Sequence, residues 1–260
     1  MRLPEAMSHD GVPEAAAAIV ERLRARSPRV HCITNAVAQN FTANVLLAAG
    51  CVPSMTLSAE EIGAFVAGAQ GLLVNLGTFD AERREATLTA VDAARQHGVP
   101  WVLDPVFVDR SPPRLEFART LVTAGPRVLR LNHGEFSVLA GRAPAREHVM
   151  HYAREAHVMV GLSGATDLVT DGTRAVTIGN GHPFMAKVTA MGCAGSALVA
   201  ACLAVEPDAL RATAAALLML GIAGELAAAK AAGPGSFAVA IIDALHALDK
   251  ATILRHAKVS

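Results

Sequence analysis

The chain has 260 residues, of which 52% are hydrophobic and only 4% aromatic, so its core must be built mainly from Ala, Val, Leu and Ile. Lys plus Arg and Asp plus Glu each number 23, which leaves no basic excess to neutralise a nucleic-acid backbone. The four cysteines show no C-x-x-C spacing and no neighbouring histidine cluster, which argues against a zinc site and against a disulfide framework.

The sequence predicts neither a membrane anchor nor a secretion signal. Its most apolar stretch, Ala212 to Ala229, contains Glu225 and two glycines, a pattern typical of a buried core helix. The Met1–Gly11 segment has mixed charges and no basic start followed by an apolar run. We therefore expect a cytoplasmic protein whose partners include neither nucleic acid nor a membrane.

Short apolar runs alternate with longer helical patterns along the first part of the chain. The helical patterns cover Pro13–Arg26, Val37–Ala49, a segment starting at Ser58 with Glu61 completing a capping box, and Asp80–His97. The predicted strands are Val30–Thr34, Val52–Met55, Leu72–Leu76, Trp101–Leu103, Val128–Leu131 and Val158–Leu162. This alternation predicts right-handed crossovers and a mainly parallel sheet in an α/β fold.

The last third of the chain has a different pattern. Residues 167–178 predict a hairpin that turns at Asp171-Gly172. From Gly192 to Leu248 the pattern is almost entirely helical, with breaks at Glu206-Pro207 and at residues 233–235. Because we find no linker and no repeat, we predict that residues 1–260 form one domain.

Polar residues follow several of the predicted strands. In sheets of this kind, ligands bind outside the carboxyl ends of the strands, so these residues mark the expected site. They are Thr34-Asn35, Asn75, Asp104, Asn132 and Ser163.

A run of small residues, 189–196, follows a strand-like segment at Ala186–Thr189 and opens an Ala-rich helix. Small residues at a helix start let backbone N–H groups and the helix dipole face an anion. The run lacks the G-K-[ST] ending of a P-loop. On the pattern alone, a simpler interpretation is slightly favoured, in which Gly192 is a turn residue and Cys193 a small apolar helix residue.

Asn132 and Glu135 lie three residues apart at the start of another predicted helix, so both face one way. The same pair fits an N-cap with a capping box, and the two interpretations are compatible. Arg130 at the preceding strand end has the alternative of a solvated charge, which is the more common case for a lone arginine. Met55 alone is more often a core residue than a ligand contact.

Six sequence blocks occur in an order that resembles the hydroxyethylthiazole kinase family. They span about Arg29 to Leu245 and are specific as a set. The blocks are T-x-x-G-C-x-x-S at 189–196, H-C-I-T-N at 31–35 with N-F-T-A-N at 40–44, N-L-G-T at 75–78, L-D-P-V at 103–106, R-L-N-H-G-E at 130–135 and G-P-G-S-F at 233–237.

The resemblance implies a ribokinase-like three-layer fold and phosphorylation of 4-methyl-5-(2-hydroxyethyl)thiazole by ATP with Mg²⁺. By resemblance, Gly192 and Cys193 form the catalytic anion hole, with Cys193 beside the acceptor hydroxyl. The resemblance further implies a homotrimer with sites between neighbouring subunits. It assigns Asn35, Val37, Met55 and Ala190 to the substrate, Arg130 and Ser163 to the nucleotide, and Asp104, Asn132 and Glu135 to the metal.

The chain also departs from the family pattern. Phe107–Arg110 forms a bulky, charged segment where the family has small residues, and the stretch between Glu135 and Val158 is short. Ala190 and Leu131 stand where glycine is typical. Two alternatives therefore stay open: a kinase for another small alcohol, and a non-catalytic thiazole-binding relative.

Overall fold

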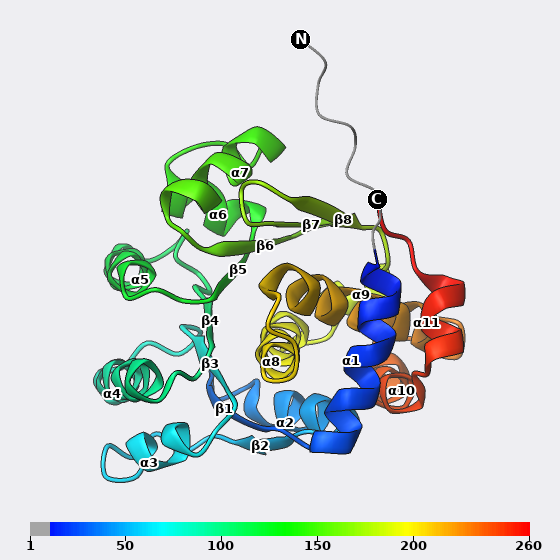
Figure 1. The fold of residues 1–260 in the computed structure, drawn as a ribbon, viewed down its shortest axis with the longest axis horizontal. Helices are drawn as coiled ribbons and strands as arrows, with labels where there is room; N and C mark the ends of the chain where they lie inside the picture. Colours follow the sequence, from blue (N-terminus) through cyan, green and yellow to red (C-terminus); the bar gives the residue numbers. More distant parts are fainter. Residues whose placement is uncertain (1–10) are drawn as a thin grey trace.

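The computed structural model describes residues 11–260, and an eight-stranded sheet runs through them (Figure 1). Its strands are β1 (Arg29–Ile33), β2 (Val52–Ser54), β3 (Gly71–Asn75), β4 (Trp101–Asp104), β5 (Val128–Asn132), β6 (Met159–Ser163), β7 (Asp167–Thr170) and β8 (Ala175–Ile178). The spatial order is β2-β1-β3-β4-β5-β6-β7-β8. Strands β1 to β6 are parallel, whereas β7 and β8 form an antiparallel hairpin. The predicted mainly parallel sheet is confirmed.

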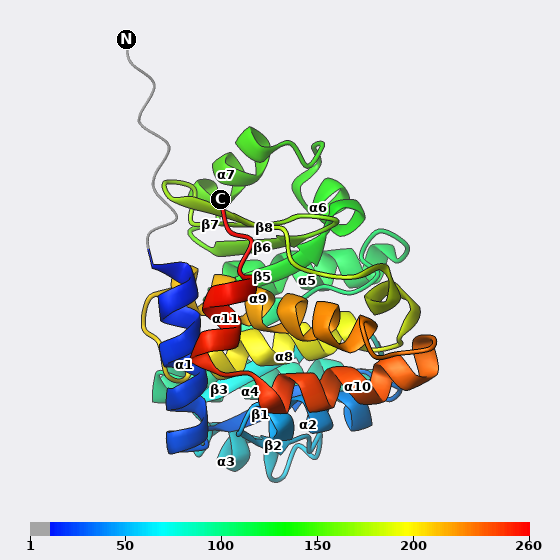
Figure 2. The same cartoon turned by 90° about the vertical axis from the view of Figure 1, so that its right-hand side faces the viewer.

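Helices cover both faces of the sheet and make a three-layer molecule (Figure 1). One face carries α1 (Val12–Arg26), α2 (Gln39–Ala48), α8 (Met191–Leu203), α9 (Ala209–Ala228), α10 (Pro234–Ala247) and α11 (Lys250–His256). The other carries α3 (Ile62–Ala67), α4 (Ala81–His97), α5 (Pro112–Thr123), α6 (His133–Ala140) and α7 (Arg146–Glu155). Each face has its own apolar core, and α8 packs on β1, β3 and β4 at the centre (Figure 2).

Helices that have a side-chain cap begin and end where the capping residues in the sequence indicate. The Asp80 carboxylate accepts a hydrogen bond from the Arg83 backbone N–H at 2.8 Å, and Gly98 ends the same helix with φ 66°. Asp208 caps α9 in the same manner. These caps fix where each helix starts, and therefore which residues its first turn presents.

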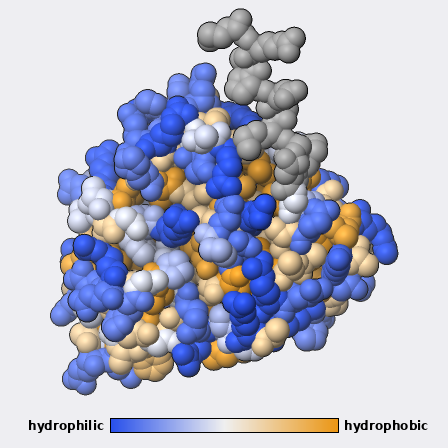
Figure 3. All heavy atoms as spheres, in the orientation of Figure 1, coloured by the Kyte–Doolittle hydropathy of each residue, from blue (hydrophilic) through white to orange (hydrophobic). Residues whose placement is uncertain are grey.

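Helix α9 is long and apolar enough to cross a membrane, yet 83% of its most apolar window is buried inside the protein. It is the core helix that the sequence predicts. All four cysteines are free and buried, so among residues 11–260 no disulfide forms. The surface in Figure 3 is mainly hydrophilic with small apolar patches. The expectation for Met1–Gly11 concerns residues 1–10, which lie outside the described part of the chain.

Two local predictions are wrong. Ala186–Thr189 is not a strand, because Pro183–Lys187 forms a 3₁₀ helix, labelled η1, whose start is capped by the His182 side chain. The Ser58 capping box does not form, since α3 starts four residues later at Ile62. The Glu61 carboxylate accepts instead from the hydroxyl of Thr56.

Three α-helices, α5, α7 and α11, have no counterpart among the predicted elements, and α11 lies beyond the predicted helical region that ends at Leu248. Helix α5 starts at Pro112-Pro113, which the first helical turn tolerates because its N–H groups need no partner within the helix. Helix α7 buries only Val149 and Ala153, which lie one turn apart in a segment that is mostly charged and polar, so few apolar positions mark it in the sequence.

Candidate active site

Polar side chains from neighbouring strands meet at the carboxyl edge of the sheet. The β3–β4 register places Asn75 opposite Asp104, and the β5–β6 register places Asn132 opposite Ser163. The first two turns of α8 reach the same edge, because the Ser196 hydroxyl donates a hydrogen bond to Asp104 and Cys193 accepts one from Asn35. The strand ends and the small-residue run of the sequence therefore belong to one site.

Asp104 is the buried carboxylate at the centre of this site, with 2% of its surface exposed. Its Oδ2 accepts from Asn75 Nδ2 and from Ser196 Oγ, each at 2.8 Å. Burial raises the pKa of Asp104, while the nearby charge of Arg130 and the two hydrogen bonds oppose this shift. The site thus holds one acidic group in a fixed orientation.

The Cys193 thiol lies beside this carboxylate. The Asn35 amide donates to Cys193 Sγ at 3.2 Å. Burial, followed by the charge of Asp104, raises the pKa of Cys193 to about 11, so the thiol is neutral near pH 7. Among residues 11–260, the buried Oδ1 of Asn35 has no hydrogen-bond partner. An acceptor is thus left for a donor group on a bound molecule.

Helix α8 begins without a side-chain cap. Its N-cap residue is Ala190, held at φ 72°, and the following N–H groups are not covered by any capping side chain. A Cβ atom on Gly192 would lie 3.0 Å from Nη1 of Arg130, so glycine allows the guanidinium to approach the helix start. The Arg130 Nε is buried and has no partner among residues 11–260. Together these groups form a positive, anion-facing corner.

Asn132 and Glu135 form the capping box of α6. Asn132 Oδ1 accepts from the Glu135 N–H at 3.0 Å, and Glu135 Oε2 accepts from the Asn132 N–H at 2.9 Å. The other oxygen, Oε1, accepts from the Phe107 N–H at 3.2 Å. Burial and then the charge of Asp104 raise the pKa of Glu135 to about 7. The structural interpretation of this pair is confirmed.

The chemistry of the two neighbouring carboxylates, Asp104 and Glu135, fits a magnesium ion. Two mutually repelling acidic groups, Asp104 and Glu135, lack a full counter-charge, and an added cation would relieve the raised pKa. Among residues 11–260 no three His, Cys, Asp or Glu side chains converge into a closed metal site. Mg²⁺ needs no such cage, since it binds through one or two carboxylates, water and phosphate oxygens.

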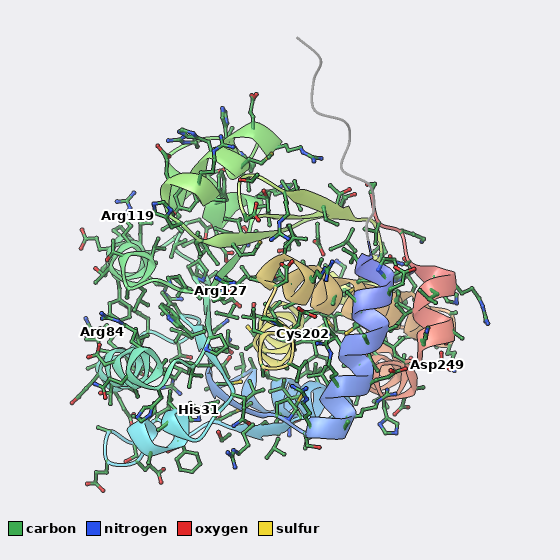
Figure 4. All side chains as sticks on the ribbon, in the orientation of Figure 1. His31, Arg84, Arg119, Arg127, Cys202 and Asp249 are labelled. Carbon is green, nitrogen blue, oxygen red and sulfur yellow. The ribbon has the colours of Figure 1, made fainter. Side chains whose placement is uncertain are left out.

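The remaining predicted residues lie around this centre with weaker contacts. Ser163 Oγ donates to the Leu131 carbonyl at 3.3 Å, so the hydroxyl is held at the end of β6. Val37 is 75% exposed and Met55 is half-buried against the core beside α2 and β2. His31, labelled in Figure 4, is buried and bonds through both ring nitrogens to Ser54 and Thr56. Val37 and Met55 by themselves do not enclose a pocket.

The sequence alone assigns no role to two side chains that position the site. Ser196 is the final residue of the T-x-x-G-C-x-x-S block, and its hydrogen bond to Asp104 joins residues 92 positions apart. Arg114 of α5 donates to the carbonyls of Gly77 and Val106, both at 3.2 Å, and so ties the loops after β3 and β4 together. No sequence motif signals Arg114, since α5 itself was missed.

This fold and site define a ribokinase-like small-molecule kinase. A ribokinase-like superfamily protein from Enterococcus faecalis shares the fold, with a TM-score of 0.67 at 14% identity over 88% of this chain and 93% of that one. The chain belongs to the hydroxyethylthiazole kinase family, which matches residues 20–251.

Individual relatives agree with this membership. A probable hydroxyethylthiazole kinase from Agrobacterium fabrum is 46% identical over 94% of both chains. A hydroxyethylthiazole kinase from Granulibacter bethesdensis is also 46% identical, over 94% of this chain and 96% of its own. The solved hydroxyethylthiazole kinase protein from Pyrococcus horikoshii has a TM-score of 0.91 and 37% identity, and the match covers 95% of this chain and 98% of that one.

Proposed function

We propose that the protein transfers the γ-phosphoryl group of ATP to the side-chain hydroxyl of 4-methyl-5-(2-hydroxyethyl)thiazole, a step of thiamin salvage. The reaction converts the alcohol and ATP into a phosphate ester, ADP and a proton. The observation that carries the proposal is the meeting of Asp104, Asn35 and the open first turn of α8 at one sheet edge. Such phosphoryl transfers depend mainly on positioning and charge stabilisation.

On the acceptor side, Asn35 and Cys193 hold the alcohol. The unpaired Oδ1 of Asn35 accepts a hydrogen bond from the substrate hydroxyl, and the neutral thiol of Cys193 forms the neighbouring wall. Because its pKa is about 11, Cys193 acts as a positioning group and not as a thiolate base. Val37, Met55 and Ala190 complete the apolar side of the thiazole site.

On the nucleotide side, the phosphates lie against α8 and β5. The Arg130 guanidinium and the N–H groups of Gly192 and Cys193 neutralise charge on the transferring phosphoryl group. Ser163 contacts the phosphate chain from the end of β6. A pre-placed donor of this kind contributes about 3 kcal/mol to the transition state.

When bound, Mg²⁺ would neutralise charge on the phosphates. Glu135 and Asp104 would hold the ion, directly or through water, and Asn132 fixes Glu135 through the capping box. In this arrangement one pair of residues both starts α6 and orients the metal-facing carboxylate.

We further propose that the enzyme is a homotrimer in the cytoplasm. Val37, two positions after Asn35, is 75% exposed and Met55 is only half-buried, which supports a thiazole pocket that a neighbouring subunit closes. Four buried free thiols suit a reducing compartment.

The direct test is incubation of the full chain with ATP, magnesium and the thiazole alcohol, with thiazole phosphate followed by mass spectrometry. Ester formation above the enzyme-free rate is the expected result. Nucleotide binding without ester would contradict the substrate and favour another small alcohol, to be found with a substrate panel. Thiazole binding by calorimetry with no nucleotide binding would contradict the enzyme itself and favour a non-catalytic relative.

A further inference from the structure

A second cavity opens at the amino ends of the parallel strands, opposite the carboxyl ends where the candidate active site lies. It has a volume of about 910 Å³ and lies at the amino ends of β4, β5 and β6, where Trp101, Val158 and Met159 contribute to its walls. A volume near this size is in the range of small-molecule sites, about 300–1,000 Å³. None of its lining residues belongs to the site around Asp104.

Arginines from four separate elements converge on this cavity. Arg95 comes from the last turn of α4, Arg127 precedes β5, Arg154 comes from the last turn of α7, and Arg174 follows the β7–β8 turn. The whole chain has a formal net charge of +0, so this concentration of positive charge is local. His157 also lines the cavity and adds a donor.

The carboxylates around the cavity are already engaged. Asp171, the one acidic residue lining it within residues 11–260, pairs with Arg174 at 2.9 Å. Asp208 at the start of α9 pairs with another nitrogen of Arg174 at 2.7 Å. Glu155 on α7 pairs with Arg142 and His151, at 3.6 and 3.1 Å. These groups therefore do not neutralise the other arginines.

The other three guanidinium groups have only weak or neutral partners within residues 11–260. Arg127 Nη2 donates to the Pro207 carbonyl at 3.3 Å, and Arg154 Nη1 donates to the Gly172 carbonyl at 2.5 Å. Arg95 lies 3.8 Å from Asp92, and both side chains are largely exposed, so this pair is weak. Unused N–H groups thus remain on three arginines around one cavity.

We propose that this cavity is a second ligand site, which binds a small anion carrying phosphate groups. Guanidinium forks match phosphate oxygens in geometry as well as in charge, and several converging forks favour a diphosphate over a single charge. The ligand contacts the amino ends of β4 and β5, whose carboxyl ends carry Asp104 and Asn132.

Calorimetric titration of the full chain with inorganic pyrophosphate tests this proposal. The catalytic end is first saturated with magnesium and a non-hydrolysable ATP analogue, at low salt. Pyrophosphate should then bind with a stoichiometry of one. The double variant Arg95→Gln/Arg127→Gln should bind pyrophosphate about tenfold or more weakly, since the two substitutions remove two charge-assisted donors. The matched control is Arg119→Gln on the outer helix α5, where binding should be unchanged (Figure 4).

Arg95 and Arg127 are chosen for substitution because neither side chain holds the fold together strongly, whereas the side chains of Arg154 and Arg174 anchor the β7–β8 turn. Thermal unfolding establishes that the double variant is folded. A folded double variant with unchanged pyrophosphate affinity overturns the proposal, and so does equal weakening by Arg119→Gln. Loss of binding in Arg130→Gln instead would assign the anion to the catalytic end and also overturn it.

Discussion

The single carboxylate of Glu135 combines its structural role in the capping box with the metal-binding role proposed for it. Its two oxygens hold the N–H groups of Asn132 and Phe107, yet burial and Asp104 raise its pKa to about 7. A carboxylate that holds a cation must be ionised. Glu135 therefore sits where a small change in pH changes its capacity for metal.

Activity at limiting magnesium should fall as pH drops through about 7, because protonated Glu135 no longer attracts the ion. Raising the magnesium concentration should move this midpoint to lower pH, since the cation stabilises the charged carboxylate. Rate profiles against pH at two magnesium concentrations measure the shift. The Glu135→Gln variant, with no group to titrate there, should lose the dependence. A pH midpoint that does not shift with magnesium concentration would contradict the proposed role of Glu135 in binding the ion.

Cys193 makes a contrasting case, because its pKa of about 11 keeps the thiol protonated. Cys193→Ala should therefore lower kcat only about fivefold, the loss of a modest contact with Asn35. Steady-state kinetics measure this, with the buried Cys202→Ala as a control for the effect of losing a thiol elsewhere in α8. A loss of about a thousandfold or more would indicate that Cys193 performs proton transfer.

At the scale of elements, the start of α8 matters most. Gly192→Ala should push the Arg130 guanidinium away from the helix start, because the new Cβ would lie 3.0 Å from Nη1. We expect kcat/KM for ATP to fall about tenfold to a hundredfold. Gly195→Ala is the control within the same helix, since its Cβ would lie 3.9 Å from Nη2 of Arg130. Its tightest contact is Leu220 Cδ2 at 3.1 Å, so thermal unfolding checks that this control variant keeps the stability of the wild type. Equal effects of the two substitutions would contradict the role of this corner.

The sheet and the strand-end residues were predictable because both follow from local patterns. Apolar runs before Asn75, Asp104 and Asn132 predict strands, and parallel strands bring their carboxyl ends to one edge. Which strands are neighbours, and hence that Asn75 bonds to Asp104, depends on topology that one sequence does not fix. The Ser196–Asp104 bond was not predicted for the same reason.

Other features that the sequence did not predict correctly also have physical causes. The Val188-Thr189 pair resembles a strand, but His182 and Pro183 upstream start a 3₁₀ helix instead. The sequence around Arg127 does not indicate the second cavity, because the other residues that line it come from distant segments of the chain. The roles of the individual site residues and the single-domain organisation stay predictions.

At the scale of the whole molecule, apolar side chains remain exposed around the β2 end of the sheet. Val52 on β2 is 48% exposed and Phe65 on α3 is 43% exposed, and both line a cavity of about 480 Å³. Val37 and Leu47 are exposed nearby in sequence, before and within α2. An edge strand flanked by such side chains is a surface that a further subunit can cover.

The proposed trimer should therefore depend on this edge. The wild-type chain of 26.9 kDa should show a mass of three subunits, about 81 kDa, by light scattering after size exclusion. Val52→Lys should dissociate it, because an ammonium group would have to be buried in an apolar interface. Thiazole phosphorylation should fall with it, since the pocket beside Val37 loses its closing subunit. Leu254→Lys on α11, 41% exposed away from β2, should leave both the mass and the activity unchanged. A wild-type monomer with full activity would show that one chain completes the thiazole site by itself.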